Sequence, residues 1–137
     1  MPFRQFDHDA DLGLEMTSPD REGIFAEAAA GLASLLTDPS TVAVREHRRV
    51  VAEGDDVAQV LVRWLKELLF LHETEGFIGI SVGDIEAGDG RVAAVVGGEK
   101  RAGGRHPLRH EVKGITYHEA SFVQAEDGWR ARVILDV

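Results

Sequence analysis

The stretch VAQVLVRWLKELL, residues 57–69, decides the fold, because its apolar side chains would cover most of a helical surface. A helix that is apolar on nearly every side is stable only when other elements cover it. We therefore expect this helix to form the centre of the core. Its start is also marked, because Asp56 stands three residues before Gln59 in a capping-box-like arrangement. The polar stripe is narrow and consists of Asp56, Gln59, Arg63, Lys66 and Glu67.

A second helix is predicted upstream, where Ser18-Pro19-Asp20 has the composition of a helix start. Ser18 can cap the first turn, Pro19 suits the first helical position, and Asp20 favours the positive helix end. Asp38-Pro39 is expected to stop this helix. Between them, apolar residues recur at spacings of three and four: Ile24, Phe25, Ala28, Ala29, Leu32, Leu35 and Leu36.

The other segments favour β-structure. Residues 3–17 read as extended, and Leu12, Leu14 and Met16 alternate with polar or small residues, as in a half-buried strand. Gly88-Asp89-Gly90 and Glu126-Asp127-Gly128 read as hairpin turns. These patterns predict one α+β domain over residues 1–137, with a mixed or antiparallel sheet and two helices packed on one face. The further strands are expected at about 42–52 (interrupted by the charged segment REHRR), 77–85, 91–96, 111–117, 119–125 and 129–137.

The composition limits the possible partners. Fifteen basic and twenty-four acidic residues give a net charge of −9, and an acidic surface repels nucleic-acid phosphates. The absence of cysteine excludes disulfides and thiolate metal sites. No apolar run approaches the roughly 20 residues that span a bilayer, and the first residues lack an apolar signal region. We expect a cytoplasmic protein with no membrane partner, which meets RNA only through another protein.

Acidic residues near both ends of the sequence are candidate metal ligands. Along one strand, Asp7, Asp9 and Asp11 would share a face, and a hard cation would relieve their repulsion. An EF-hand loop is excluded, because its glycine falls one position late and Ser18 stands where its glutamate should be. If the first and last strands are neighbours, Asp11 and Asp136 would meet. An exposed acidic strand end remains the alternative for either segment.

Two further segments carry candidate chemistry. Residues 97–110 are rich in glycine and cations, but they fail the Walker pattern, so a hairpin loop is favoured over contacts with a partner's nucleotide or RNA. In EVKGITYH, residues 111–118, Lys113 lies on a predicted strand, where a lysine usually keeps its ammonium in water. No nucleophile stands out together with its base, which counts against a self-sufficient enzyme.

Five segments together resemble the archease family from end to end: FDHDADLGLEM (6–16), AAAGLASLLTD (28–38), LVRWLKELLFLHETEGF (61–77), EVKGITYH (111–118) and WRARVILDV (129–137). The resemblance implies an accessory protein, not an enzyme, that activates an RtcB-type RNA ligase in tRNA splicing or RNA repair. Such proteins promote guanylylation of the ligase, in a GTP- and Mn²⁺-dependent reaction, and support multiple turnover.

The resemblance also implies a metal site. Asp11, Asp136 and a terminal oxygen of Val137 would bind a divalent cation: Ca²⁺ in crystals, with Mn²⁺ or Mg²⁺ as alternatives. Lys113 falls in a family motif and would support the site. Asp9 stands where the family usually has threonine, and it adds a carboxylate there.

Two other functions remain open on the residues alone. A metal-dependent phosphohydrolase or nuclease would use Asp7, His8, Asp9 and Asp11, and it would act on phosphoesters without a ligase. A chaperone-like or tRNA-binding adaptor would suppress aggregation or bind RNA with a strong salt dependence, which the charge of −9 disfavours.

Overall fold

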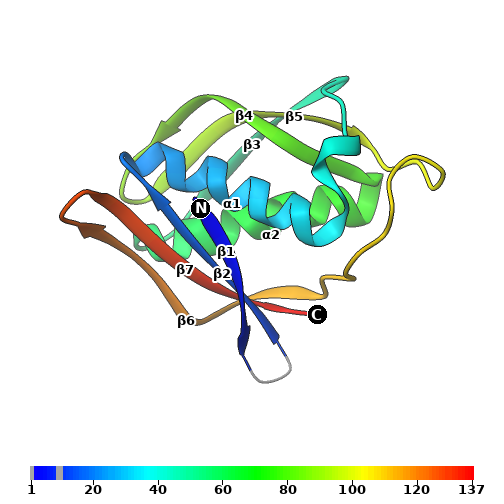
Figure 1. Ribbon diagram of the computed structural model, residues 1–137. Coiled ribbons are helices and arrows are strands. Elements are labelled where there is room, and N and C mark those ends of the chain that lie inside the picture. The colour runs from blue at the N-terminus through cyan, green and yellow to red at the C-terminus, as the bar shows by residue number, and fades with distance from the viewer. Residues whose placement is uncertain (1, 9–10) are drawn as a thin grey trace.

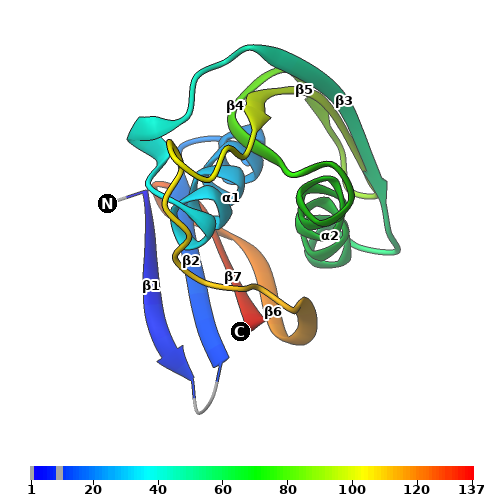
Figure 2. The ribbon, with the colours of Figure 1, turned by 90° about the vertical axis from the view of Figure 1, so that its right-hand side faces the viewer.

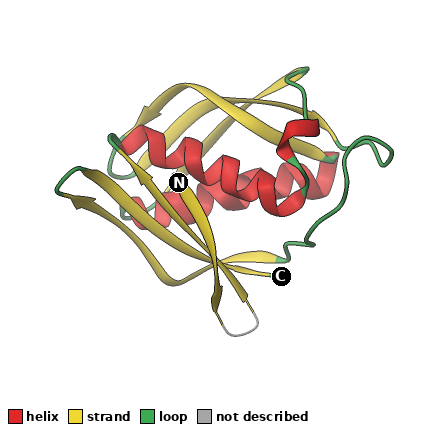
Figure 3. Ribbon diagram, in the orientation of Figure 1, coloured by secondary structure: helices red, strands yellow, loops and turns green. Residues whose placement is uncertain are grey.

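Two helices lie between two antiparallel sheets in the computed structural model (Figures 1 and 3). It describes residues 2–8 and 11–137, without the side chains of Asp7 and His8. The helices are α1 (Arg21–Leu36) and α2 (Val57–Glu75), and a short 3₁₀ turn, η1, covers Pro39–Thr41. The four-stranded sheet has the order β1 (Phe3–His8), β2 (Asp11–Ser18), β7 (Gly128–Asp136) and β6 (Gly114–Ala125). The three-stranded sheet has the order β3 (Glu46–Glu53), β5 (Arg91–Lys100) and β4 (Phe77–Ala87).

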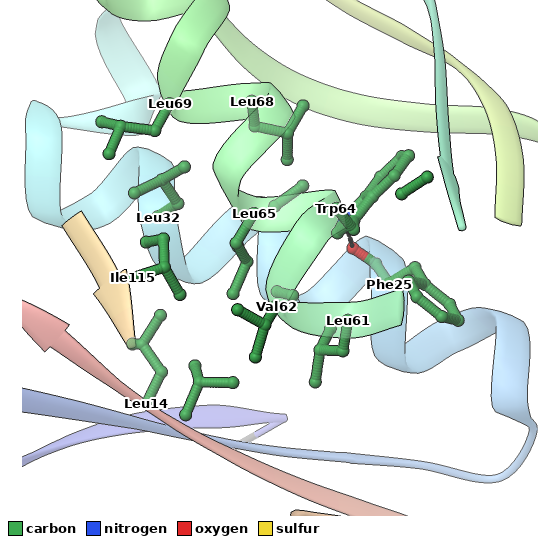
Figure 4. Packing of buried hydrophobic residues seen from close by; sticks show 14 of the residues in the cluster. Leu14, Phe25, Leu32, Leu61, Val62, Trp64, Leu65, Leu68, Leu69 and Ile115 are labelled. Atoms are coloured by element: carbon green, nitrogen blue, oxygen red, sulfur yellow. Dashed lines mark hydrogen bonds between the residues drawn. The ribbon is translucent and has the colours of Figure 1, made fainter. Parts of the chain in front are cut away.

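The α+β prediction is confirmed, and so is the central place of α2. Turning the molecule shows α2 enclosed between the two sheets, with α1 beside it (Figure 2). Trp64 is fully buried, and its indole N–H donates a 3.0 Å hydrogen bond to the carbonyl of Phe25 on α1 (Figure 4). The rings of Trp64 and Phe25 also meet edge to face, with centroids 5.8 Å apart. None of the described helices is long and apolar enough to cross a bilayer.

The helix starts are set by aspartates. Asp56 caps α2 by accepting from the N–H of Gln59, and the Gln59 side chain accepts from the N–H of Asp55 at 2.6 Å. This confirms the capping-box-like reading. The N-cap of α1 is Asp20, whose carboxylate accepts a 2.8 Å hydrogen bond from the N–H of Gly23. The prediction that Ser18 caps this helix was therefore wrong. The hydroxyl of Ser18 accepts instead from the N–H of Asp20.

Several strand boundaries differ from the sequence prediction. The extended stretch 3–17 is two antiparallel strands, in which His8 of β1 pairs with Asp11 of β2. The segments 111–117 and 119–125 belong largely to one strand, β6, whose register shifts between Thr116 and Ser121. The REHRR segment does not interrupt β3, because residues 46–49 lie within it. A single sheet was expected. The structure has two sheets, and the helices pack against one face of each sheet.

The pairing of β2 with β7 joins segments from opposite ends of the sequence. Its register runs from Leu12 opposite Leu135 to Ser18 opposite Trp129. Side chains alternate between the two faces of a strand. Leu14 and Val133 therefore point toward the helices with the rest of the core, while Gly13 and Ile134 lie on the outer face.

Replacing Trp64 with alanine should lower the free energy of unfolding by about 3–5 kcal/mol, because the change leaves a large cavity between α1 and α2. Phe70→Ala is the matched control on the same helix, since Phe70 is 60% exposed. Its effect should stay within about 0.5 kcal/mol. Urea unfolding of the three proteins measures both values, and equal losses would contradict the central role of Trp64.

Candidate functional site

Asp11 and Asp136 are brought together by the register of β2 and β7. Leu12 and Leu135 form the last pair of this ladder, and Asp11 and Asp136 each stand one residue beyond it. Asp11 begins β2 and Asp136 ends β7, so both lie at one open end of the sheet. We call this pair the acidic tip.

Both carboxylates are accessible and belong to the outer face. Leu12 and Leu135 pack against or within the core, so their neighbours Asp11 and Asp136 face away from the helices. Asp136 is exposed, and Asp11 is half-buried. Two oxygen-donor side chains on one accessible edge suit a hard divalent cation.

Lys113 and Val137 also lie at this end of the sheet. The backbone N–H of Lys113 donates a 2.7 Å hydrogen bond to the carbonyl of Asp136, and the lysine side chain is exposed. Val137 is half-buried, and its side chain packs against the main hydrophobic core. The structure thus holds both residues next to Asp136 through the backbone and the core.

The expectation that Asp7 and Asp11 lie along one strand was wrong, because they belong to β1 and β2. The two strands are antiparallel, and Asp7 pairs with Leu12. His8 is the residue that pairs with Asp11. Asp9 lies outside the described residues.

The described residues were compared with the donor set that a divalent cation requires. Over residues 2–8 and 11–137, apart from the side chains of Asp7 and His8, no group of three or more His, Asp or Glu side chains could hold a metal ion. The acidic tip contributes two carboxylates of the required chemistry. The donor set therefore fits a hard cation through Asp11 and Asp136, with further oxygen atoms needed to complete the shell.

The glycine-rich segment leads from the three-stranded sheet to the acidic tip. Its first residues, 97–100, continue β5, so the predicted loop is shorter than expected. The remainder follows the end of α1. The N–H groups of Arg109 and His110 donate to the carbonyls of Leu36 and Leu35, at 3.1 and 2.8 Å. These bonds satisfy carbonyls that a helix end leaves unpaired.

A buried carboxylate anchors the start of this segment. Glu99 is 3% exposed, and its Oε2 accepts from the N–H of Ala43 at 2.6 Å and lies 3.2 Å from Nε2 of the fully buried His106. The Nδ1 atom of His106 accepts from the N–H of Ala102, so its Nε2 carries the proton and donates to Glu99. Sequence reasoning missed this anchor; an acidic residue in a run of cations and glycines was the available signal.

Two arginines complete the anchor. Arg45 and Arg105 each place a guanidinium nitrogen 3.2 Å from Oε1 of Glu99. The N–H of Ala43 lowers the pKa of the Glu99 carboxyl; burial opposes this effect, and His106 and Arg105 add to it. A carboxyl with a lowered pKa in the folded state stabilises the fold when ionised.

Glu99→Gln should therefore lower the melting temperature at neutral pH. The stabilisation by ionised Glu99 is fully present above the unfolded pKa of about 4.3 and is lost as the pH falls through the lower folded pKa. The difference in melting temperature between wild type and Glu99→Gln should accordingly shrink in acid. Glu111→Gln, at an exposed position of the same segment, is the control and should match wild type. A pH-independent difference for Glu99→Gln would contradict the role of its charge.

Comparisons with known proteins agree with this architecture. The chain matches the Archease protein family over residues 3–137. It is 36% identical to the archease of Methanopyrus kandleri, over the full length of both chains, and 34% identical to that of Methanothermobacter thermautotrophicus, over 98% of each. The solution structure of protein 1598 from Methanobacterium thermoautotrophicum is similar, with a TM-score of 0.81 and 34% identity, covering 99% of each chain.

A more distant structure shares the fold. The crystal structure of an archease from Thermotoga maritima, described as a possible chaperone, has a TM-score of 0.67 at 15% identity and covers 98% of this chain and 96% of its own. The match over nearly the whole sequence and the identities above 30% establish the family. This chain belongs to the archease family.

Proposed function

We propose that this protein is a non-enzymatic activator of an RtcB-type RNA ligase, and that the acidic tip is its active element. The observation that supports the proposal is the β2–β7 pairing, which brings the start of β2 with Asp11 and the end of β7 with Asp136 to the same end of the sheet. Family membership supports it, because the five segments that resemble archeases include both aspartates.

The tip would hold a divalent cation (Mn²⁺, Mg²⁺ or Ca²⁺) through Asp11, Asp136 and a C-terminal oxygen of Val137. A bound cation supplies positive charge that aligns phosphate oxygens and offsets the charge that develops during phosphoryl transfer. The packing of Val137 against the core and the bond from Lys113 to Asp136 restrict the position of the strand end. Such restriction is what a metal ligand requires to keep its geometry. Asp9 would add a further carboxylate.

The exposed ammonium of Lys113 is suited to a different role. Its backbone N–H is hydrogen-bonded to Asp136 and its side chain is exposed, so Lys113 lies beside the end of β7 that carries Asp136. A flexible cation at this place would contact a phosphate group of the nucleotide that the ligase holds. The protein would thus act on the guanylylation step of the ligase, and RNA would be held by the ligase.

Asp11→Asn and Asp136→Asn should each reduce stimulation of ligase guanylylation at least about tenfold. Mutation of a residue that merely supports a metal ligand already lowers activity by about this factor, and a ligand itself should matter at least as much. The assay measures the rate at which the cognate ligase forms its GMP adduct from labelled GTP. Asp84→Asn is the matched control: it is exposed on β4, and asparagine tolerates its positive φ of 49°. Calorimetric titration with Mn²⁺ should show weaker binding for the two tip variants only.

Normal stimulation by both tip variants would refute the metal site. Wild-type protein that hydrolyses phosphoesters alone with Mn²⁺ would favour the nuclease alternative. Suppression of aggregation, with no effect on the ligase, would favour a chaperone.

Extending the chain beyond Val137 should also weaken stimulation, because a peptide bond removes the carboxylate proposed as a ligand. A variant with several added glycines and serines, compared with the same addition before Met1, isolates this effect. The expected result is weaker Mn²⁺ binding for the C-terminal extension alone. Equal binding by both proteins would remove Val137 from the ligand set.

A further inference from the structure

The outer face of the four-stranded sheet carries a group of arginines. The register aligns Arg4, Glu15 and Arg132 in one row across β1, β2 and β7, and places Arg130 in the next row beside Val123 of β6. All lie on the side away from the helices, since their strand neighbours belong to the core. We call Arg4, Phe6, Glu15, Arg130 and Arg132 the arginine face.

The charge of this face is opposite to that of the protein. Three arginines and one glutamate give it a formal charge of +2, whereas the whole chain carries −9, so the rest of the chain carries −11. Arg4 and Glu15 form an ion pair at 3.3 Å, which leaves Arg130 and Arg132 as the surplus cations. Arg130 is exposed and makes no ion pair within the part of the chain that the structure describes. A local cationic patch on an acidic protein favours an acidic partner.

Arg132 is held in place by an aromatic ring. Phe6 lies across Gly13, where a Cβ atom would collide with the ring, so only glycine allows this close approach. The guanidinium of Arg132 lies 4.1 Å from the centre of the Phe6 ring, and that of Arg4 lies 5.7 Å away. The Nε atom of Arg132 is buried without a hydrogen-bond partner among the described residues. A guanidinium fixed in this way loses little freedom on binding a carboxylate.

A cleft of about 430 Å³ lies beside Arg130, at the end of the strands β2 and β7. Arg130 and Thr17 line it together with Trp129, Pro19 and Asp127. It lies at the end of β2 and β7 that is opposite to the acidic tip. An aromatic wall beside a cation is the kind of depression that accepts an anchoring side chain of a protein partner.

The geometry points to a docking surface: the arginine face binds an acidic surface of the RtcB-type ligase and thereby aims the acidic tip at the ligase's active site. This inference rests on the proposed function. Arg132 and Asp136 lie on the same face of β7, four residues and about 13 Å apart. A partner that contacts the arginines is therefore within reach of the tip.

A protein suits this face better than an RNA strand. Glu15 lies among the arginines, and Val123, which is 53% exposed, adjoins Arg130. The carboxylate of Glu15 would repel a phosphate backbone, and the apolar side chain of Val123 would not bind one. Arginine and aromatic residues are enriched at protein interfaces, and their cores combine apolar and polar contacts. The charge of −11 on the rest of the chain also repels a long polyanion.

The double variant Arg4→Glu/Arg130→Glu tests the inference. Binding to the cognate ligase should weaken at least about tenfold, which corresponds to about 1.4 kcal/mol. Arg49→Glu/Arg91→Glu is the matched control, because it makes the same change in net charge at exposed strand positions of the other sheet. Its affinity should stay near that of wild type. Calorimetry at low and high salt should show a smaller salt dependence for the face variant than for the control.

The guanylylation assay separates docking from the chemistry of the tip. The face variant should need about tenfold more protein for half-maximal stimulation while approaching the wild-type plateau, whereas Asp11→Asn should lower the plateau. If wild type does not stimulate the ligase, the proposed function fails and this inference fails with it. If wild type stimulates and the face variant binds as tightly as the control, only the docking surface is wrong.

Two other occupants of the face give distinct results. A wild-type dimer in sedimentation that dissociates in the face variant, with unchanged ligase affinity, would assign the face to a second copy of the chain. Binding of a single-stranded RNA oligonucleotide that is lost in the face variant, again with unchanged ligase affinity, would assign it to RNA. Either result overturns the proposal.

Discussion

The antiparallel pairing of β2 with β7 is the constraint on which the other features depend. It pairs Leu12 with Leu135, which stands 123 positions later in the sequence. Because the side-chain period of a strand is two, a slip of one residue would move every core side chain of β2 to the solvent face. The burial of Leu14, Met16 and Val133 therefore fixes the register. The same register brings Asp11 and Asp136 to one end of the sheet, so the stability of the core and the position of these two residues are linked.

Sequence reasoning predicted the elements whose signals are local. The apolar surface of α2 and its cap at Asp56 could be read directly, as could the hairpin after Gly88. The reversal after His8 could not, since β1 and β2 read as one extended stretch. The position of Glu119, with a positive φ of 58°, lies in the irregular part of β6 and likewise carried no clear signal. Local patterns do not specify where a strand is interrupted when neighbouring strands decide it.

The sequence predicted the candidate site only on the condition that two distant strands are neighbours in the sheet. The meeting of Asp11 with Asp136 required that the first and last strands be neighbours, which no spacing could show, and the structure supplies that pairing. The anchor formed by Glu99 and His106 was missed, because its partners come from separate parts of the chain. The arginine face was missed for the same reason: Arg4 and Arg132 are distant in sequence and stand on either side of Glu15 only when the sheet forms. The net charge of the whole chain, −9, gave no indication of a local group of cations.

The order β1-β2-β7-β6 also affects how the protein folds during its synthesis. β2 emerges from the ribosome before its neighbour β7, which is made more than a hundred residues later. Until then one edge of the β1–β2 hairpin has open hydrogen-bonding groups, and Leu14 and Met16 lack the adjoining strand. Exposed edges of this kind invite pairing with other chains. The nascent protein thus passes through a stage in which protection of that edge by the ribosome or a chaperone would favour correct folding.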